Sequence, residues 1–378
     1  MTGYERCLET MARRPADRVP AYTPTVASDV ASLILGRPAH TGGPALWHAE
    51  ADAWCRGESC LEDFDARVEE DIIDLHRALG QDVIRFPWRL GLRPTARIDA
   101  FTFRCGEGDG APVWRWDPDT PNFFPINGNR DNRVEDWPAM ARAAQDQADG
   151  RLARIREQAG IPERRLQERL GGSMLVVAGG AGLSLGVDEP SLMAALLEPA
   201  AVADLLDCQL AAALEQVRAL ACRGVKAVLG GGDMADKNGP LYSPELFGRF
   251  MLPRWKKIAG ACREAGLHYV WRSDGNLWKV ADMLFREAAL PGFGEVDHEA
   301  SMAVRAVRAR FPELVLWGCL SGDLIRRGSP GEVYQHSREA LEASSGRGYF
   351  HGCSNTILPG TPPANVAAMM RARDDFKG

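Results

Sequence analysis

One short segment of the sequence places a cation and an acid two positions apart at the end of an apolar run. Arg272 and Asp274 follow residues 268–271 and are followed by Gly275 and Asn276. Alternate residues of a strand share one side, so both charged groups point the same way. Arg272 suits a carboxylate or phosphate, and Asp274 suits substrate binding or proton transfer. A buried ion pair that only supports the fold is the alternative. Gly275 permits a sharp turn, and Asn276 either caps the next helix or binds substrate.

A second pair of reactive side chains, His351 and Cys353, is also two positions apart. Imidazole and thiolate are zinc ligands, and Asp274 would add an oxygen ligand. The sequence therefore offers Cys353, Asp274 and His351 as a metal set. A hydrogen-bonded histidine beside a buried thiol is the alternative, and burial is favoured for Cys319.

Further candidates follow two other apolar runs. Asp233 comes directly after two glycines and is a candidate catalytic acid. Asn238 and Tyr242 lie in the next loop, which is either a substrate-binding loop or a rigid connection. Glu295 is a candidate substrate ligand, although the charged run 295–299 also fits a solvated loop.

Three arginines follow the second apolar run of the chain. Arg85, with Arg89 and Arg93 behind it, either meets an anionic substrate or forms a solvated face.

The elements that must position these residues alternate between short apolar runs and helical patterns. Such alternation is typical of parallel strands joined by helical crossovers. Eight runs predict a distorted (β/α)8 TIM-type barrel, whose active site lies at the carboxyl ends of the strands. A doubly wound open sheet is the alternative, but Gly180–Gly186 misses its dinucleotide-binding spacing. The eight runs are residues 18–22, 82–86, 174–178, 226–231, 268–273, 292–296, 314–319 and 346–353.

Segments that do not follow this alternation predict insertions, and single residues mark the boundaries of one helix. Residues 98–117 predict a β-hairpin inserted on the barrel, and residues 133–170 predict charged helices. Ser243 and Gly266 mark the start and end of one helix, and Pro253 is expected to kink it. No repeat or low-complexity linker is found, so residues 1–378 are expected to form a single domain.

Composition narrows the class of protein. The 45 Lys and Arg against 51 Asp and Glu give a net charge of −6, which offers no reason to expect a nucleic acid or a membrane surface as partner. No apolar run is long enough to span a membrane, and the first residues do not resemble a signal peptide. The nine cysteines include no Cys-x-x-Cys pair. A cytoplasmic enzyme with a small-molecule substrate is expected.

Taken together, several segments resemble the uroporphyrinogen decarboxylase superfamily, which includes corrinoid-dependent methyltransferases. They are residues 13–20, 78–83, 232–247, 273–276 and 352–366. The resemblance implies a distorted barrel, in agreement with the strand count. It is closer to the methyltransferase-like branch, because the arginine- and glutamine-rich N-terminal motif of the decarboxylase is missing.

In that branch a His-x-Cys and a later Cys hold zinc, and a separate corrinoid protein exchanges the methyl group. The matching positions here are Arg272, Asp274 and Cys353. An arginine cannot ligate zinc. Either the metal is lost, or it lies lower, with Asp274, Cys353 and His351 or Glu295.

The resemblance implies a corrinoid-linked methyltransferase or demethylase acting on a small methylated compound, with a carboxylate to match Arg272. A metal-free decarboxylase or lyase and a non-catalytic binding barrel are the alternatives.

Overall fold

The chain forms a closed barrel of eight parallel strand positions. The computed structural model describes residues 1–108, 110–127 and 133–377. The strand positions in order are residues 20–22, β2 (Val83–Ile84), β7 with β8 (Leu175–Val176 and Ala178–Gly179), β9 (Ala227–Gly231), β12 (His268–Arg272), β13 (Gly292–Gly294), β14 (Val315–Trp317) and β15 (Tyr349–Phe350). All eight predicted strands are present, and the predicted fold class is confirmed.

Backbone hydrogen bonds close the ring between its first and last strands. The Tyr22 amide donates to the His351 carbonyl over 2.8 Å, and the Asp82 amide donates to the Ala21 carbonyl over 3.0 Å. The pairing continues beyond the ring, where β1 (Thr25–Val26) lies parallel to β16 (Thr356–Ile357). Residues 20–22 therefore link the second strand to the eighth.

Alternate residues of these strands fill the barrel, and the others face the surrounding helices. The inward side chains form one apolar cluster, which includes Tyr22, Leu175, Val177, Leu229, Val270, Trp317 and Phe350. Trp317 stacks on Phe350 with ring centroids 3.6 Å apart. The barrel interior is thus packed below its mouth.

Helix α1 (Gly3–Met11) closes the amino-terminal end of the barrel. Its Cys7 lies in the interior cluster, and its Tyr4 amide donates to Gly172. Beside it, buried Asp82 pairs with Arg6 and with Arg18. The opposite end, where the strands finish, is therefore the open end.

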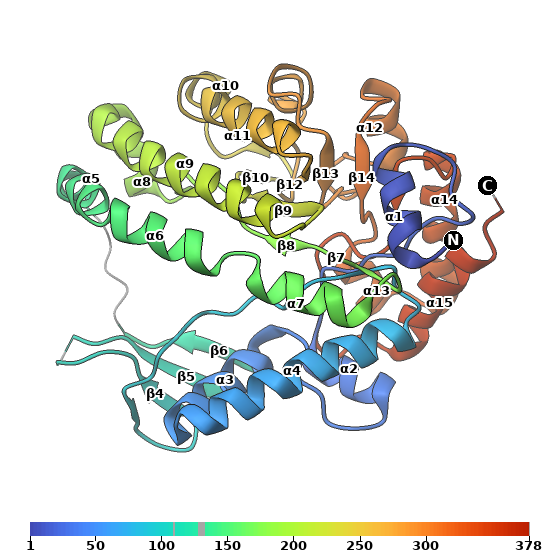
Figure 1. The fold of residues 1–378 in the computed structure, drawn as a ribbon, viewed down its shortest axis with the longest axis horizontal. Helices are drawn as coiled ribbons and strands as arrows, with labels where there is room; N and C mark the ends of the chain where they lie inside the picture. The colour runs from blue at the N-terminus through green and yellow to red at the C-terminus, as the bar shows by residue number, and fades with distance from the viewer. Residues whose placement is uncertain (109, 128–132, 378) are drawn as a thin grey trace.

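Helices surround most of the barrel (Figure 1). They are α2 (Ser28–Leu35), α3 (Gly43–Arg56), α4 (Glu58–Ala78), η1 (Val134–Asp136), α5 (Trp137–Asp146), α6 (Ala148–Gln158), α7 (Ile161–Leu170), α8 (Glu189–Leu197), α9 (Pro199–Cys222), α10 (Pro244–Leu246), η2 (Phe247–Met251), α11 (Leu252–Glu264), η3 (Met283–Glu287), α12 (Val304–Arg310), α13 (Gly322–Arg327), α14 (Pro330–Ser344) and α15 (Pro363–Asp374). Residues 133–170 are helical, as predicted.

The helix predicted from residue 244 is interrupted before its proline. Ser243 caps α10 by accepting from the Leu246 amide, as expected. The next turn, η2, is a π-helix, and regular α-helix resumes at Leu252 with Pro253 in its first turn. Because proline has no N–H to donate, the chain changes its hydrogen-bond register here.

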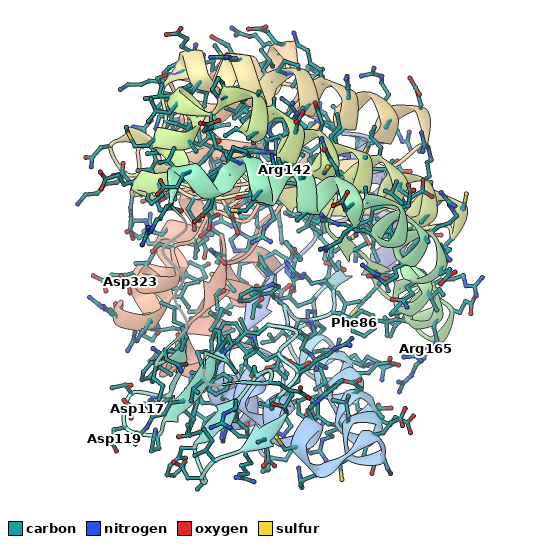
Figure 2. All side chains as sticks on the ribbon, turned by 90° about the vertical axis from the view of Figure 1, so that its left-hand side faces the viewer. Phe86, Asp117, Asp119, Arg142, Arg165 and Asp323 are labelled. Carbon is teal, nitrogen blue, oxygen red and sulfur yellow. The ribbon has the colours of Figure 1, made fainter. Side chains whose placement is uncertain are left out.

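The predicted hairpin is part of a larger antiparallel sheet at the lower left of Figure 1. Its strands are β3 (Ala96–Arg97), β4 (Thr102–Arg104), β5 (Val113–Asp117) and β6 (Asn122–Pro125), paired in sequence order. The β4–β5 pair is the predicted hairpin, and position 109 of its turn lies outside the described residues. Buried Phe103 and Phe123 pack on Ala51 of α3. In Figure 2, Phe86 lies between this sheet, marked by Asp117, and the helices, marked by Arg142.

Among the described residues, no helix is long and apolar enough to cross a membrane.

Candidate functional site

Three neighbouring strands bring three carboxylates together at the open end of the barrel. In the sheet register, Arg272 at the end of β12 faces Gly231 of β9 on one side and Gly294 of β13 on the other. The residues that follow these strand ends are therefore neighbours. Carboxylate oxygens of Asp233, Asp274 and Glu295 lie within 4.8 Å of one another. Asp233 is exposed, Asp274 is half-buried and Glu295 is buried.

Arg272 is held against this acidic group by Glu295. The Arg272 Nη2 atom donates to Glu295 Oε1, and the two side chains are 23% and 3% exposed. Glu295 adopts a left-handed backbone conformation, with φ at 62°. Such a conformation is uncommon for a residue with a side chain, and it aims the carboxylate back at β12. The ion pair with Asp274, which the sequence left open as the alternative for Arg272, is replaced here by the pair with Glu295.

Glycines on both flanking strands make room for Arg272. A Cβ atom at Gly294 would lie 3.0 Å from Arg272 Cγ, and one at Gly231 would lie 2.1 Å from the Arg272 carbonyl oxygen. Gly231 also has φ at 134°, a conformation that favours glycine. The glycines at these strand ends therefore let a guanidinium fill the barrel mouth.

Asp274 is fixed by an amide from the last barrel segment. Asn355 Nδ2 donates to Asp274 Oδ2 over 3.0 Å. Burial raises the pKa of Asp274, and the negative charges of Asp233 and Asp297 raise it further. The Asn355 hydrogen bond and the charge of Arg272 act in the opposite direction. Asp274 therefore keeps a proton to higher pH than an ordinary aspartate.

The loop beyond Asp274 is held by backbone contacts. The Gly275 amide donates to Asp297 over 3.2 Å, and the Asn276 amide donates to the Asp236 carbonyl over 2.7 Å. Asn276 Oδ1 accepts from the Trp278 amide. Asn276 therefore orders a turn in this loop, and no helix begins directly after it, so the expected helix cap is not formed.

Two residues at the site were not predicted. Asn355 lies two positions after Cys353, inside the last family-like segment, so its polar side chain after a strand was a usable signal. Tyr22 ends the first strand, and its ring lies inside the barrel, edge-on to Trp317 with centroids 5.3 Å apart. Its hydroxyl is buried without a hydrogen-bond partner among the described residues. An apolar strand gives no signal that a tyrosine points inward.

The loop with Asn238 and Tyr242 is a rigid connection. It joins β10 (Ala235–Asp236) to β11 (Gly239–Pro240) as a short antiparallel pair. The Asn238 side chain bonds Asp236 at the surface. Tyr242 is buried with its hydroxyl against Met234 Sδ, 3.6 Å away. Neither side chain contacts the three carboxylates.

The three arginines after β2 do not act together. Arg89 pairs with Glu50 and Asp65, and the Arg93 guanidinium lies over the Trp54 ring. Arg85 remains near the mouth, where its charge lowers the pKa of Arg272. A cluster of cations for an anionic substrate is therefore not formed.

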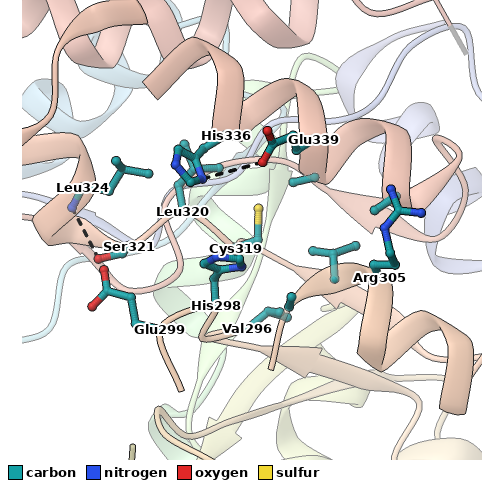
Figure 3. A pocket seen from close by; sticks show the side chains of 14 residues that line it. Val296, His298, Glu299, Arg305, Cys319, Leu320, Ser321, Leu324, His336 and Glu339 are labelled. Atoms are coloured by element: carbon teal, nitrogen blue, oxygen red, sulfur yellow. Dashed lines mark hydrogen bonds and ion pairs between the residues drawn. The ribbon is translucent and has the colours of Figure 1, made fainter. Parts of the chain in front are cut away.

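A separate pocket of about 640 Å³ lies between the ends of β13 and β14 and the helices around them. Figure 3 shows Cys319, His298, His336 and Glu339 around it. The Cys319 thiol contacts the Tyr349 hydroxyl at 2.6 Å, and burial raises its pKa to about 12. None of the three mouth carboxylates lines this pocket.

The sequence profile of the uroporphyrinogen decarboxylase (URO-D) family matches residues 187–376. This stretch runs from α8 through α15 and carries all three mouth carboxylates. The chain belongs to the uroporphyrinogen decarboxylase family. The predicted family is confirmed.

Comparison with solved structures finds one that shares the fold of this URO-D family member. A methyltransferase from Methanosarcina mazei is similar with a TM-score of 0.64 and 18% identity, over 100% of this chain and 99% of that chain. A protein described as a vitamin-B12-independent methionine synthase from Listeria monocytogenes has a TM-score of 0.38 and 15% identity, over 57% of this chain and 69% of that chain. No curated protein matches the chain.

The zinc ligands expected from the resemblance are not assembled in this family member. His351 faces the outer helices, where its Nδ1 lies 3.2 Å from the Tyr349 hydroxyl. Burial is the main cause that lowers the pKa of His351 to about 3. Burial also raises the pKa of Cys353 to about 12, and Cys353 lies outside the group of potential ligand atoms at the mouth.

The structure does not bring Cys353, Asp274 and His351 together as one group of ligands. Among the described residues, the group of potential ligand atoms that gathers at the mouth consists of Asp233, Asp274 and Glu295. These are oxygen donors, and the Arg272 guanidinium already bonds one of them. A zinc site of the sulfur and nitrogen type does not fit these residues.

Proposed function

We propose that this URO-D family member transfers a methyl group between a small methylated compound and a corrinoid carried by a separate protein. The observation that carries the proposal is the set of mouth residues Asp233, Asp274 and Glu295 around Arg272, at the single open end of the barrel. The likeness in fold to a methyltransferase supports it.

The mouth residues would bind and orient the small substrate. Asp274 lies where it can exchange a proton with the heteroatom that carries the methyl group, because its raised pKa brings its titration closer to neutral pH. Asn355 fixes the direction of that carboxyl. Arg272 and Glu295 form a rigid wall beside it, which limits the orientations of a bound molecule.

The methyl group would face the solvent end of the barrel. Asp233 is the exposed member of the carboxylate group and marks that direction. A corrinoid would supply a nucleophilic cobalt atom, presented by its own protein over the mouth. No step is assigned to zinc, because the cysteine and histidine ligands are not assembled.

The two alternatives fit the site less well. A decarboxylase would need cations around its carboxylate substrate, but Arg89 pairs with acids outside the mouth and Arg272 is bonded to Glu295. A protein that only binds a ligand would have no use for the raised pKa of Asp274, because such shifts are typical of catalytic acids.

Methyl transfer to cob(I)alamin tests the proposal. The purified protein is incubated without oxygen with free cob(I)alamin and a panel of methylated amines, methyl ethers and methyl thioethers. Methylated cobalamin, followed by its absorbance, is expected with at least one class, and the Asp274→Asn variant is expected to lose most of the rate. No transfer from any class would overturn the proposal.

A further inference from the structure

The barrel mouth has more acidic than basic side chains. Three carboxylates lie within 4.8 Å of one another, and the one guanidinium among them is bonded to Glu295. Asp297 adds a fourth acid nearby, since its charge acts on Asp274. Arg85 is the only other cation found to act on Arg272. Even with Asp274 protonated, the three carboxylates of Asp233, Glu295 and Asp297 outnumber the two guanidinium groups of Arg272 and Arg85.

We infer that the substrate carries its methyl groups on a positively charged nitrogen, as in a methylated or quaternary ammonium ion. This inference rests on the proposed function, because it names the substrate class of the same site. It reverses the expectation that Arg272 selects an acidic substrate. Arg272 is held by Glu295, so a second anion would meet the remaining carboxylates.

A second feature of the mouth points to the same ligand. The Tyr22 side chain is 2% exposed, and its hydroxyl has no hydrogen-bond partner among the described residues. The Tyr22 ring packs edge-on against Trp317, and the sheet register places Trp317 level with Arg272, because Gly294 pairs with both. Buried hydroxyls are normally hydrogen-bonded, so this oxygen is available to a ligand in the mouth.

An aromatic oxygen and several carboxylates together suit an ammonium ion. A methylated ammonium spreads its charge over its methyl hydrogens and is attracted by aromatic groups and by carboxylates without strong directional bonds. An N–H of an incompletely methylated amine would donate directly to Tyr22 or to a carboxylate. A divalent metal ion is disfavoured, because it needs several carboxylate oxygens as direct ligands and Glu295 Oε1 already bonds Arg272.

The chemistry of transfer agrees with a charged nitrogen. The bond between carbon and nitrogen would break with its electron pair left on nitrogen, and the corrinoid would supply the electron pair that the methyl carbon accepts. The product is a neutral amine, so Asp274 would not have to give a proton to this substrate, as it would to an ether or a thioether. The carboxylates would then act as the counter-charge of the ammonium substrate.

Binding of matched probes to the full-length protein tests the inference. Choline carries a quaternary ammonium group, 3,3-dimethyl-1-butanol has the same shape without the charge, and methoxyacetate carries a methyl group beside an anion. Calorimetry at constant ionic strength is expected to show choline binding, with the neutral alcohol weaker by about tenfold or more. No choline binding, equal binding of the alcohol, or tighter binding of methoxyacetate would overturn the inference.

Asp233→Asn is the informative variant, because this exposed side chain can change without disturbing the packed barrel. It is expected to weaken choline binding by about fivefold and to leave binding of the neutral alcohol unchanged. Asp323→Asn is the control, because Asp323 (labelled in Figure 2) is an exposed acid on α13 that pairs with Arg327 and is not one of the three mouth carboxylates. Equal loss in both variants would overturn the inference, as would displacement of choline by stoichiometric Mg²⁺.

The binding assay needs no corrinoid, so the two proposals can fail separately. Selective choline binding without methyl transfer from any compound would overturn the proposed function and keep this inference. Methyl transfer from ethers, with no ammonium ion bound or demethylated, would overturn this inference and keep the proposed function.

Discussion

The Arg272 guanidinium and the Glu295 carboxylate, from neighbouring barrel strands, form an ion pair that is nearly enclosed at the barrel mouth. The pair places a fixed positive charge where family resemblance led us to expect a metal. It also orients Glu295 away from solvent, which leaves Asp233 and Asp274 as the accessible acids. Several measurable consequences follow from this arrangement and its neighbours.

Breaking the ion pair from one side should be costly. Glu295→Gln leaves a largely buried guanidinium without its counter-charge, and we expect a loss of about 3–5 kcal/mol in the free energy of unfolding. Arg272→Met leaves the carboxylate alone and should cost a similar amount, whereas the double variant should recover much of the loss. Urea unfolding measures all three. Additive losses in the double variant would contradict a direct pair.

Asp274 should make stability fall as pH rises. Its pKa is raised in the folded protein from an ordinary value of 3.8, so the folded chain keeps a proton that the unfolded chain has lost. The free energy of unfolding therefore decreases with pH from about pH 4 up to the folded pKa. Asp274→Asn should remove this decrease, and Asp323→Asn should keep it. The comparison is made by urea unfolding between about pH 4 and about pH 8, a range that starts near the ordinary pKa of an aspartate and extends above it.

Asn355 should set the pH range of the same group. Its amide donates to the ionised Asp274 carboxylate, so Asn355→Ala is expected to raise the pKa of Asp274 further. Choline affinity depends on the ionised carboxylate, so it is lost as pH falls through that pKa. The midpoint of this loss should move to higher pH in Asn355→Ala. An unchanged midpoint would show that Asn355 does not act on Asp274.

Two buried tyrosines should respond in opposite ways to removal of the hydroxyl. Tyr349→Phe loses the contact with the Cys319 thiol and is expected to cost about 1 kcal/mol of stability. Tyr22→Phe removes a hydroxyl without a partner, so its stability should equal or exceed that of the wild type. Choline binding should weaken only in Tyr22→Phe. Thermal unfolding and calorimetry on the same samples separate the two effects.

Metal content should distinguish this member from a zinc-dependent enzyme. Protein purified without added zinc is expected to contain far less than one zinc ion per chain, because Cys353 lies outside the group of potential ligand atoms and His351 points away from the mouth. Cys353→Ser should leave the metal content unchanged. Elemental analysis that finds one zinc per chain, lost in the variant, would contradict this prediction.

The fold could be predicted because buried parallel strands are short apolar runs between helices, and this pattern survives in the sequence. The position of the site followed from the rule that barrel strands carry function at their carboxyl ends. Asp233, Asp274 and Glu295 were all named on that basis. The sequence therefore located the acidic residues without showing that they meet.

The partners within the site could not be predicted. The ion pair of Arg272 depends on the register between β12 and β13, and Glu295 is aimed by a local left-handed turn. Neither property leaves a pattern in a single sequence. The outward direction of the His351 side chain could not be predicted for a related reason. The last strand is buried on both sides, so hydrophobicity does not reveal that Phe350 points inward and His351 outward.

Helix α1 and the ion pairs of Asp82 close the amino-terminal end of the barrel, which leaves the carboxyl end of the strands as its opening. A small molecule that reacts inside must enter and leave by the opening over which a protein partner would dock. If the proposed function holds, substrate entry would precede docking, and product release would wait for the partner to dissociate. The proposed function therefore predicts an ordered sequence of binding, in which excess partner slows turnover by covering the opening.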